Sequence, residues 1–203
     1  MPADDNTRLS ELHDHYKDTF QDLQASIRQR EKFFVLTVLL TALLVLRTFS
    51  PDVTANTVAE FLKGRFGLPH IDTAVFGSVL WFALLYSVLR YSQIVVLIDR
   101  RYPYLHTLEG LLRAEYNNMA FTREGQAYLE NYPKLQSWAS GLYTFVFPLA
   151  LMLVVAIATG MEFFAAGPRI YLIFNISMGL LILVSVVLYL HYVQVQKPKE
   201  EVF

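Results

Sequence analysis

The residues able to do chemistry are few and scattered. The chain has five histidines and no cysteine, which excludes disulfides, thiolate metal sites and a cysteine nucleophile. His13 and His15 are the only close histidine pair, but residues two apart on a helix point to different faces, which makes a poor metal site. The sequence contains no HExxH, no GxSxG, no glycine-rich phosphate loop and no acidic metal cluster. We therefore expect a protein that is not an enzyme, with no catalytic residue, no cofactor and no metal.

Two other classes of function find little support in these residues. An enzyme that acts on lipid would need titratable groups at the membrane surface, and Asp99, His106 and Glu109 are the only clustered candidates. A nucleic-acid-binding protein would carry a basic excess, whereas this chain has 17 Lys and Arg against 18 Asp and Glu. We expect no nucleic-acid partner.

Arg90 is the most deeply placed charge in the sequence. It follows the apolar run 74–89 and precedes Gln93 by three residues. One interpretation is that its guanidinium reaches the inner lipid headgroups. The other is that it faces a water-filled bundle interior and forms a cationic ring in an oligomer. With Asn175, a polar residue inside the run 170–193, these residues are the candidate lining of a pore or vestibule: Arg90, Gln93 and Asn175.

Such residues must be positioned by helices in a membrane. Hydrophobic residues make up 54% of the chain, charged residues only 17%, and the mean hydropathy is +0.35. Most of the excess of hydrophobic over charged residues lies in the four runs 33–46, 74–89, 142–159 and 170–193. A helix needs about 20 apolar residues to cross a bilayer core about 30 Å thick. The runs contain no Asp or Glu, so proton-coupled transport through an acidic residue in a span is not favoured.

The predicted fold is an all-α integral membrane protein with four transmembrane helices, a long N-terminal cytoplasmic helix and a helical cytoplasmic loop. Arg47 lies near the outer end of the first span, where we expect it to reach the headgroups. Pro148 is expected to kink the third span, and Asn175 and Ser177 to form hydrogen bonds between helices. The predicted segments are a cytoplasmic amphipathic helix (1–32), a first span (33–49), an outer loop (50–73), a second span (74–98), a cytoplasmic helical loop (99–137), a third span (138–160), an outer hairpin (161–169), a fourth span (170–193) and a cytoplasmic tail (194–203).

The distribution of positive charge predicts the orientation. Segments 1–32 and 99–137 carry five Lys and Arg each and the tail carries two, whereas the two outer loops carry two and one. The positive-inside rule therefore places both termini in the cytoplasm. The polar first 32 residues also argue against a cleavable signal peptide. We expect a multi-pass protein of the inner, or plasma, membrane.

The N-terminal segment is predicted to form one helix that runs unbroken into the first span. Its apolar residues follow helical spacing, and neither Pro nor Gly occurs between Arg8 and Phe33. The stripe could pack on the chain's own central loop, form a coiled coil between subunits, or lie on the bilayer. Together with a second stripe in the loop, it forms the candidate partner-binding or oligomer face: Leu9, Leu12, Tyr16, Leu23, Ile27, Leu105, Leu108 and Leu112.

Proline, glycine and asparagine residues predict the breaks in the two larger loops. The second span should continue to about Tyr102, after which Pro103 bends or restarts the helix. Asn117-Asn118 predicts a break, followed by a short helix over Arg123–Asn131. In the outer loop we expect a short helix around Asn56–Leu62.

Two segments carry a resemblance to known families. Phe121–Pro133 (FTREGQAYLENYP) resembles a stretch found in uncharacterised bacterial four-span membrane proteins. The first 116 residues are similar in layout to SLATT-type membrane effectors, with a cytoplasmic helix, a two-span hairpin and another cytoplasmic helix. That resemblance implies an oligomeric pore-forming or membrane-perturbing effector, or sensor subunit, of a bacterial defence or stress system. The alternative is a membrane anchor that recruits a cytosolic partner. We expect the bilayer, further copies of the chain and a cytosolic protein as partners.

Overall fold

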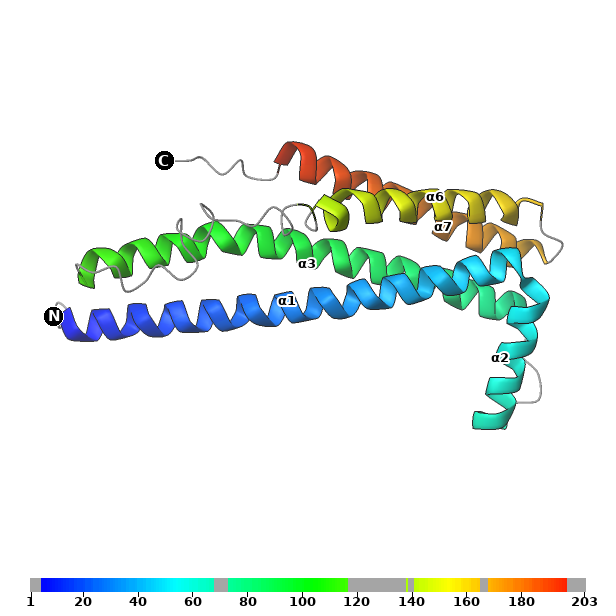
Figure 1. Cartoon of the computed structure of the whole chain (residues 1–203), viewed down its shortest axis with the longest axis horizontal. Helices are drawn as coiled ribbons and strands as arrows, with labels where there is room; N and C mark the ends of the chain where they lie inside the picture. Colours follow the sequence, from blue (N-terminus) through cyan, green and yellow to red (C-terminus); the bar gives the residue numbers. More distant parts are fainter. Residues whose placement is uncertain (1–4, 68–72, 117–137, 139–140, 165–167, 197–203) are drawn as a thin grey trace. The chain divides into compact units, whose positions relative to one another are not determined.

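The computed structural model describes residues 5–67, 73–116, 138, 141–164 and 168–196, and no residue in these ranges lies in a β-strand. The all-α fold class is confirmed for this part of the chain. In chain order the elements are α1 (Asp5–Phe49), α2 (Pro51–Phe66), α3 (Thr73–Tyr116), the π-helical segment η2 (Leu142–Val146), α6 (Phe147–Glu162), α7 (Arg169–His191) and the π-helical segment η3 (Tyr192–Gln196) (Figure 1).

Four helical stretches in the described ranges are long and apolar enough to cross a membrane. They correspond in order to the four predicted spans. Which membrane they cross, and on which side the termini lie, stay predictions from the charge distribution. The stretches are Thr7–Phe49, Ala74–Glu115, Leu142–Glu162 and Arg169–Val195.

The prediction of one long N-terminal helix is confirmed, because α1 runs for 45 residues without a break. Its apolar half contains three threonines, which would leave hydroxyl groups without partners in lipid. Each instead donates to the carbonyl four residues earlier, at 2.7 Å from Thr37 to Phe33, from Thr41 to Thr37 and from Thr48 to Leu44. Because each hydroxyl has a hydrogen-bond partner in its own helix, these polar side chains do not interrupt α1.

Helix α3 differs from the expectation at one point. The helix has 44 residues and continues through Pro103, so of the two predicted alternatives, a bend or a restart, the restart is wrong. A proline inside a helix removes one hydrogen bond, which packing on both sides can offset. Ile98 and Leu105, which flank it, are both buried. Helix α3 is described up to Tyr116. The break predicted at Asn117-Asn118 and the helix predicted over 123–131 both lie outside the described residues.

The outer-loop helix exists but is longer than predicted. Helix α2 has 16 residues and begins with Pro51, whose missing N–H costs nothing in a first turn. It ends at Gly67, which adopts the left-handed conformation at φ 67° and donates its N–H to the carbonyl of Lys63 at 3.1 Å. Glycine meets this φ without steric cost.

The last two spans form a helical hairpin. Helices α6 and α7 approach closely where a Cβ on Gly179 would overlap the hydroxyl of Thr159. Pro148 lies in the first turn of α6, directly after the π-helical segment η2. Since proline cannot donate to the preceding turn, the irregularity expected there appears as this widened turn.

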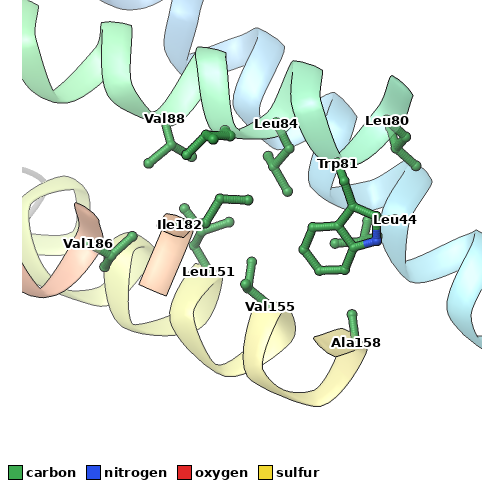
Figure 2. Packing of buried hydrophobic residues seen from close by; sticks show 11 residues of the cluster. Leu44, Leu80, Trp81, Leu84, Val88, Leu151, Val155, Ala158, Ile182 and Val186 are labelled. Atoms are coloured by element: carbon green, nitrogen blue, oxygen red, sulfur yellow. The ribbon is translucent and has the colours of Figure 1, made fainter. Parts of the chain in front are cut away.

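The chain divides into two compact units, each described here by itself. The first, called the arm, contains α1 up to Glu31 and α3 from Gln93. The second, called the membrane unit, contains the rest of α1 and α3 together with α2, η2, α6 and α7. Its core brings together α1, α3, α6 and α7 (Figure 2) and consists of Leu44, Leu80, Trp81, Leu84, Leu85, Val88, Leu151, Val155, Ala158, Ile182 and Val186.

Candidate functional site: a buried ion pair and the polar contacts of the arm

The membrane unit contains a buried ion pair at one end of its core. Nη1 of Arg47 on α1 lies 2.6 Å from Oε1 of Glu162, the last residue of α6. The indole Nε1–H of Trp81 on α3 donates to the same oxygen at 3.1 Å. The Arg47 and Glu162 side chains are 21% and 6% exposed. The carboxylate thus ties three helices together through one oxygen.

The pair depends on a glycine on the neighbouring helix. A Cβ built on Gly77 of α3 would overlap the guanidinium group of Arg47. Any larger residue at this position would displace the guanidinium from where it meets Glu162. Gly77 and Trp81 lie four residues apart and therefore on one face of α3. That face provides both the space for the arginine and the donor for its partner.

This arrangement corrects two expectations. The sequence predicts that Arg47 extends to the headgroups, whereas its guanidinium donates to the carboxylate of Glu162. The sequence predicts Glu162 in the outer hairpin 161–169, whereas α6 continues through this residue and its side chain is buried. The physical reason is that each charge neutralises the other, so the helix can extend one more half turn into the packed bundle. Arg47 lies near the predicted outer end of the first span and Glu162 two residues beyond that of the third, but the sequence does not say that these two spans are neighbours.

The second oxygen of the carboxylate is also buried. Oε2 of Glu162 has no hydrogen-bond partner among the described residues, and neither has the buried hydroxyl of Thr159, one turn earlier on α6. A buried acceptor without a partner costs free energy of about 1–3 kcal/mol. The attraction between Arg47 and Glu162 must offset this cost together with the cost of removing both charges from water.

Two further polar contacts join helices of the membrane unit. Ser78 on α3 donates to Oδ1 of Asn175 on α7 at 2.9 Å, and the hydroxyls of Thr37 and Ser87 lie 2.6 Å apart between α1 and α3. Asn175 is thus a packing residue, which confirms the expectation that it bonds between helices. Ser177 differs from the expectation, because its hydroxyl donates to Ile173 of its own helix at 2.8 Å.

Within the membrane unit, the candidate vestibule residues Arg90 and Asn175 do not lie together. Asn175 meets Ser78, which precedes Arg90 on α3 by about 18 Å at 1.5 Å rise per residue. Arg90 is half-buried in the membrane unit, and Gln93 is exposed in the arm. The structure therefore separates Asn175 from Arg90, and Asn175 instead forms a hydrogen bond with Ser78.

The arm has its own polar contacts between α1 and α3. The hydroxyl of Tyr16 donates to Oε1 of the buried Glu109 at 3.1 Å, and Nε2 of His15 lies 2.6 Å from the hydroxyl of Tyr104. Nδ1 of His106 lies 3.6 Å from Oε2 of the same glutamate. Among the described residues, no group of three or more His, Asp and Glu side chains could hold a metal ion.

A third contact ties the arm near its middle. Nη1 of Arg101 donates to the carbonyl of Asp22 at 3.1 Å and contacts the hydroxyl of Ser26 at 2.9 Å. Its Nη2 also lies 3.8 Å from the exposed carboxylate of Asp22. The two helices of the arm are therefore fixed against sliding by contacts spread along α1 from His15 to Ser26.

The residues proposed as a partner or oligomer face are used largely inside the chain. Four of the eight are buried in the arm, and the rest are half-buried. This matches the alternative in which the N-terminal stripe packs on the chain's own central segment. Such a face is not open to another protein in this conformation. The buried residues are Leu23, Leu105, Leu108 and Leu112, and the half-buried ones are Leu9, Leu12, Tyr16 and Ile27.

Comparison with known proteins finds no matching family model, no matching curated protein and no matching solved structure. The resemblance to SLATT-type effectors stays a prediction from layout.

Proposed function

We propose that this chain is a non-enzymatic, oligomeric inner-membrane protein in which the arm receives a cytosolic signal and passes it to the membrane spans. The observation that carries the proposal is the continuity of two helices. Helices α1 and α3 each contribute to both units, and neither is interrupted where the units meet, at Glu31–Lys32 and Ser92–Gln93. Because successive turns of a helix are hydrogen-bonded, a displacement of the arm is passed along it.

The polar contacts of the arm are where a signal would act. Glu109 is buried, accepts from Tyr16 and has His106 beside it. A ligand or partner that competes for any of these groups changes how α1 meets α3. The signal would then change the contact between α1 and α3, which these hydrogen bonds otherwise hold in place.

The output we propose is a pore-forming or membrane-perturbing activity in a bacterial defence or stress system. Its support is the layout resemblance together with the position of Arg90, a half-buried charge on a helix that crosses the membrane unit. In an oligomer, Arg90 and Gln93 are the residues that we place nearest an inner vestibule between copies.

Ion flux through liposomes tests this output. Purified protein is reconstituted at several protein-to-lipid ratios, and K⁺ and Cl⁻ release is measured while native mass spectrometry gives the subunit number. We expect an oligomer that passes ions, with a changed rate in Arg90→Ala and an unchanged rate in Arg113→Ala, an exposed arm residue. A monomer that passes no ions at any ratio would overturn the proposal.

Transmission along the helices is tested by glycines at the unit boundary. Each glycine in a helix interior costs about 1 kcal/mol of helix stability, so Glu31→Gly with Lys32→Gly loosens α1 where the units meet. Glu11→Gly with Asp18→Gly puts the same number of glycines at exposed positions within the arm. We expect the first pair to change ion flux several-fold more than the second. Equal effects would contradict transmission through α1.

A second candidate function, a membrane anchor that recruits a cytosolic protein, is favoured by one exposed face of the arm. Leu97, Tyr104 and Leu111 follow one another at seven-residue spacing on α3 and are 41–52% exposed. Two turns of a helix return each to the same side. If this face recruits a partner, a co-purifying protein is lost in Leu97→Glu with Leu111→Glu and kept in Arg113→Glu. A bound protein that is indifferent to the leucine changes would contradict this candidate.

A further inference from the structure

One side of α1 is exposed along both halves of the helix. In the apolar half, this side carries Val35, Leu39 and Leu46, which are 54–57% exposed. Intervals of four and seven residues keep these side chains on one side of a helix with 3.6 residues per turn. An apolar side that the chain itself leaves open is the surface that acyl chains contact in a bilayer.

Toward the N-terminus, the same side of α1 carries two cations. Lys32 lies three residues before Val35, Arg28 lies four residues before Lys32, and both side chains are exposed. The side then continues through the exposed Ala25 and Gln21, which carry no charge. Next to the span, the order along this side of α1 is therefore apolar, basic and neutral. The same order suits acyl chains, lipid phosphates and water.

The spacing of the two cations along α1 matches the thickness of one headgroup layer, which is about 5–8 Å. Lys32 directly precedes the apolar run that begins at Phe33. Because a helix rises about 1.5 Å per residue, Arg28 lies about 6 Å farther along the axis than Lys32. Gln21 lies about 17 Å beyond Lys32, outside that layer. The two exposed cations on this side of α1 are thus at the depth of lipid phosphates.

These two positive charges are not neutralised by the chain. Within the part of the chain that the structure describes, neither Arg28 nor Lys32 forms an ion pair. Residues 28–32 contain three cations, with the half-buried Arg30 as the third, and one carboxylate, the exposed Glu31, which leaves two net positive charges. A zwitterionic lipid brings an ammonium group with its phosphate, whereas an anionic phospholipid does not. The positive turn therefore favours the anionic lipid.

We propose that Arg28 and Lys32 bind the phosphates of anionic phospholipids, whose acyl chains pack along Val35 and Leu39. The guanidinium of Arg28 presents a planar fork that matches two phosphate oxygens, and the ammonium of Lys32 adds a second charge one helical turn closer to the acyl chains. This binding site is independent of the pore and anchor functions, because it concerns only how the first span meets the bilayer.

The absence of cysteine makes a local test possible, because Val35→Cys then carries a single fluorophore beside Lys32. The full chain is reconstituted into vesicles of phosphatidylcholine and phosphatidylglycerol, with a nitroxide near the headgroup end of the acyl chains of one lipid or the other. Fluorescence quenching gives the relative association of the two lipids at this position. Arg28→Gln with Lys32→Gln removes the proposed site. Arg8→Gln with Lys17→Gln is the matched control, since it removes two exposed cations of the same helix about 16 Å or more from Arg28.

We expect phosphatidylglycerol to associate several-fold more strongly than phosphatidylcholine, and this preference to disappear in Arg28→Gln with Lys32→Gln but to persist in the control pair. Arg28→Lys with Lys32→Arg keeps both charges and should keep the preference, which separates loss of charge from disturbance of the helix. An equal fall in both glutamine pairs would indicate a diffuse field of the arm and overturn the proposal. Equal association of the two lipids with the otherwise native chain would overturn it too. Quenching by neither lipid would show that protein, such as a second copy, covers this side, and would also overturn it.

Discussion

The guanidinium of Arg47 and the carboxylate of Glu162 meet at 2.6 Å although 115 positions separate them in the sequence. The contact joins the first span to the third and, through Trp81, to the second. Charged groups near the end of a span are commonly explained by contact with headgroups, whereas here two of them satisfy each other inside the protein. The pair fixes the register of three helices at a single point.

Removing either charge should destabilise the membrane unit. With its partner gone, the remaining charge stays largely buried, and we expect Arg47→Met or Glu162→Gln alone to lower the free energy of unfolding by about 2–4 kcal/mol. The double variant should lose less than the sum of the two. Unfolding of the detergent-solubilised protein by a denaturing detergent measures each value, with Arg113→Met as the exposed control. Strictly additive losses would mean that the two side chains are not coupled.

Gly77→Ala should act on the same pair from the neighbouring helix. The new methyl group would occupy the position of the Arg47 guanidinium, so we expect a loss of about 1–3 kcal/mol. Gly160→Ala is the matched control, since nothing lies within 4 Å of a Cβ built there. The same unfolding assay compares the two. If both alanines are tolerated equally, the close approach of Arg47 to α3 is not maintained in solution.

Two serine-to-alanine variants compare the loss of a hydrogen bond between helices with the loss of one within a helix. Ser78→Ala removes the donor to Asn175, which leaves a buried amide oxygen without that partner, at a cost of about 0.6–2 kcal/mol. Ser177→Ala removes a hydroxyl that donates to Ile173 of its own helix and should change stability little. Matching unfolding curves for the two variants would argue against an interhelical role of Asn175.

Neighbouring leucines on α3 test the core of the arm. Leu112 is fully buried, whereas its neighbour Leu111 is 52% exposed. The same truncation to alanine can therefore be compared at a buried and an exposed position. Leu112→Ala should cost about 2–5 kcal/mol of local stability and speed amide hydrogen exchange in α1 up to Glu31, whereas Leu111→Ala should not. Exchange is read by mass spectrometry on the intact reconstituted protein. Faster exchange in Leu111→Ala alone would mean that the arm packs through its other face.

The sequence predicted the helices well and the buried charges poorly, for physical reasons. An unbroken helix over α1 follows from apolar spacing and the lack of Pro and Gly, which are local properties of the chain. The pairing of Arg47 with Glu162 depends on which spans become neighbours, and no local pattern contains that information. Continuity through Pro103 likewise rests on the burial of Ile98 and Leu105. Asn175 was predictable as a hydrogen-bonding residue, but its partner Ser78 was not.

The unbroken course of α1 and α3 also limits how related chains can change length. Each residue added or removed near position 31 would rotate everything beyond it by about 100°, because the helix has 3.6 residues per turn. Along α1, the buried Leu23 and Leu44 on either side of the change would then lose their present angular spacing around the helix. Insertions or deletions at this level should therefore be tolerated mainly near whole turns, such as seven or eleven residues, and in both helices together. A chimera that exchanges the arm between two such proteins has to preserve helical phase as well as sequence.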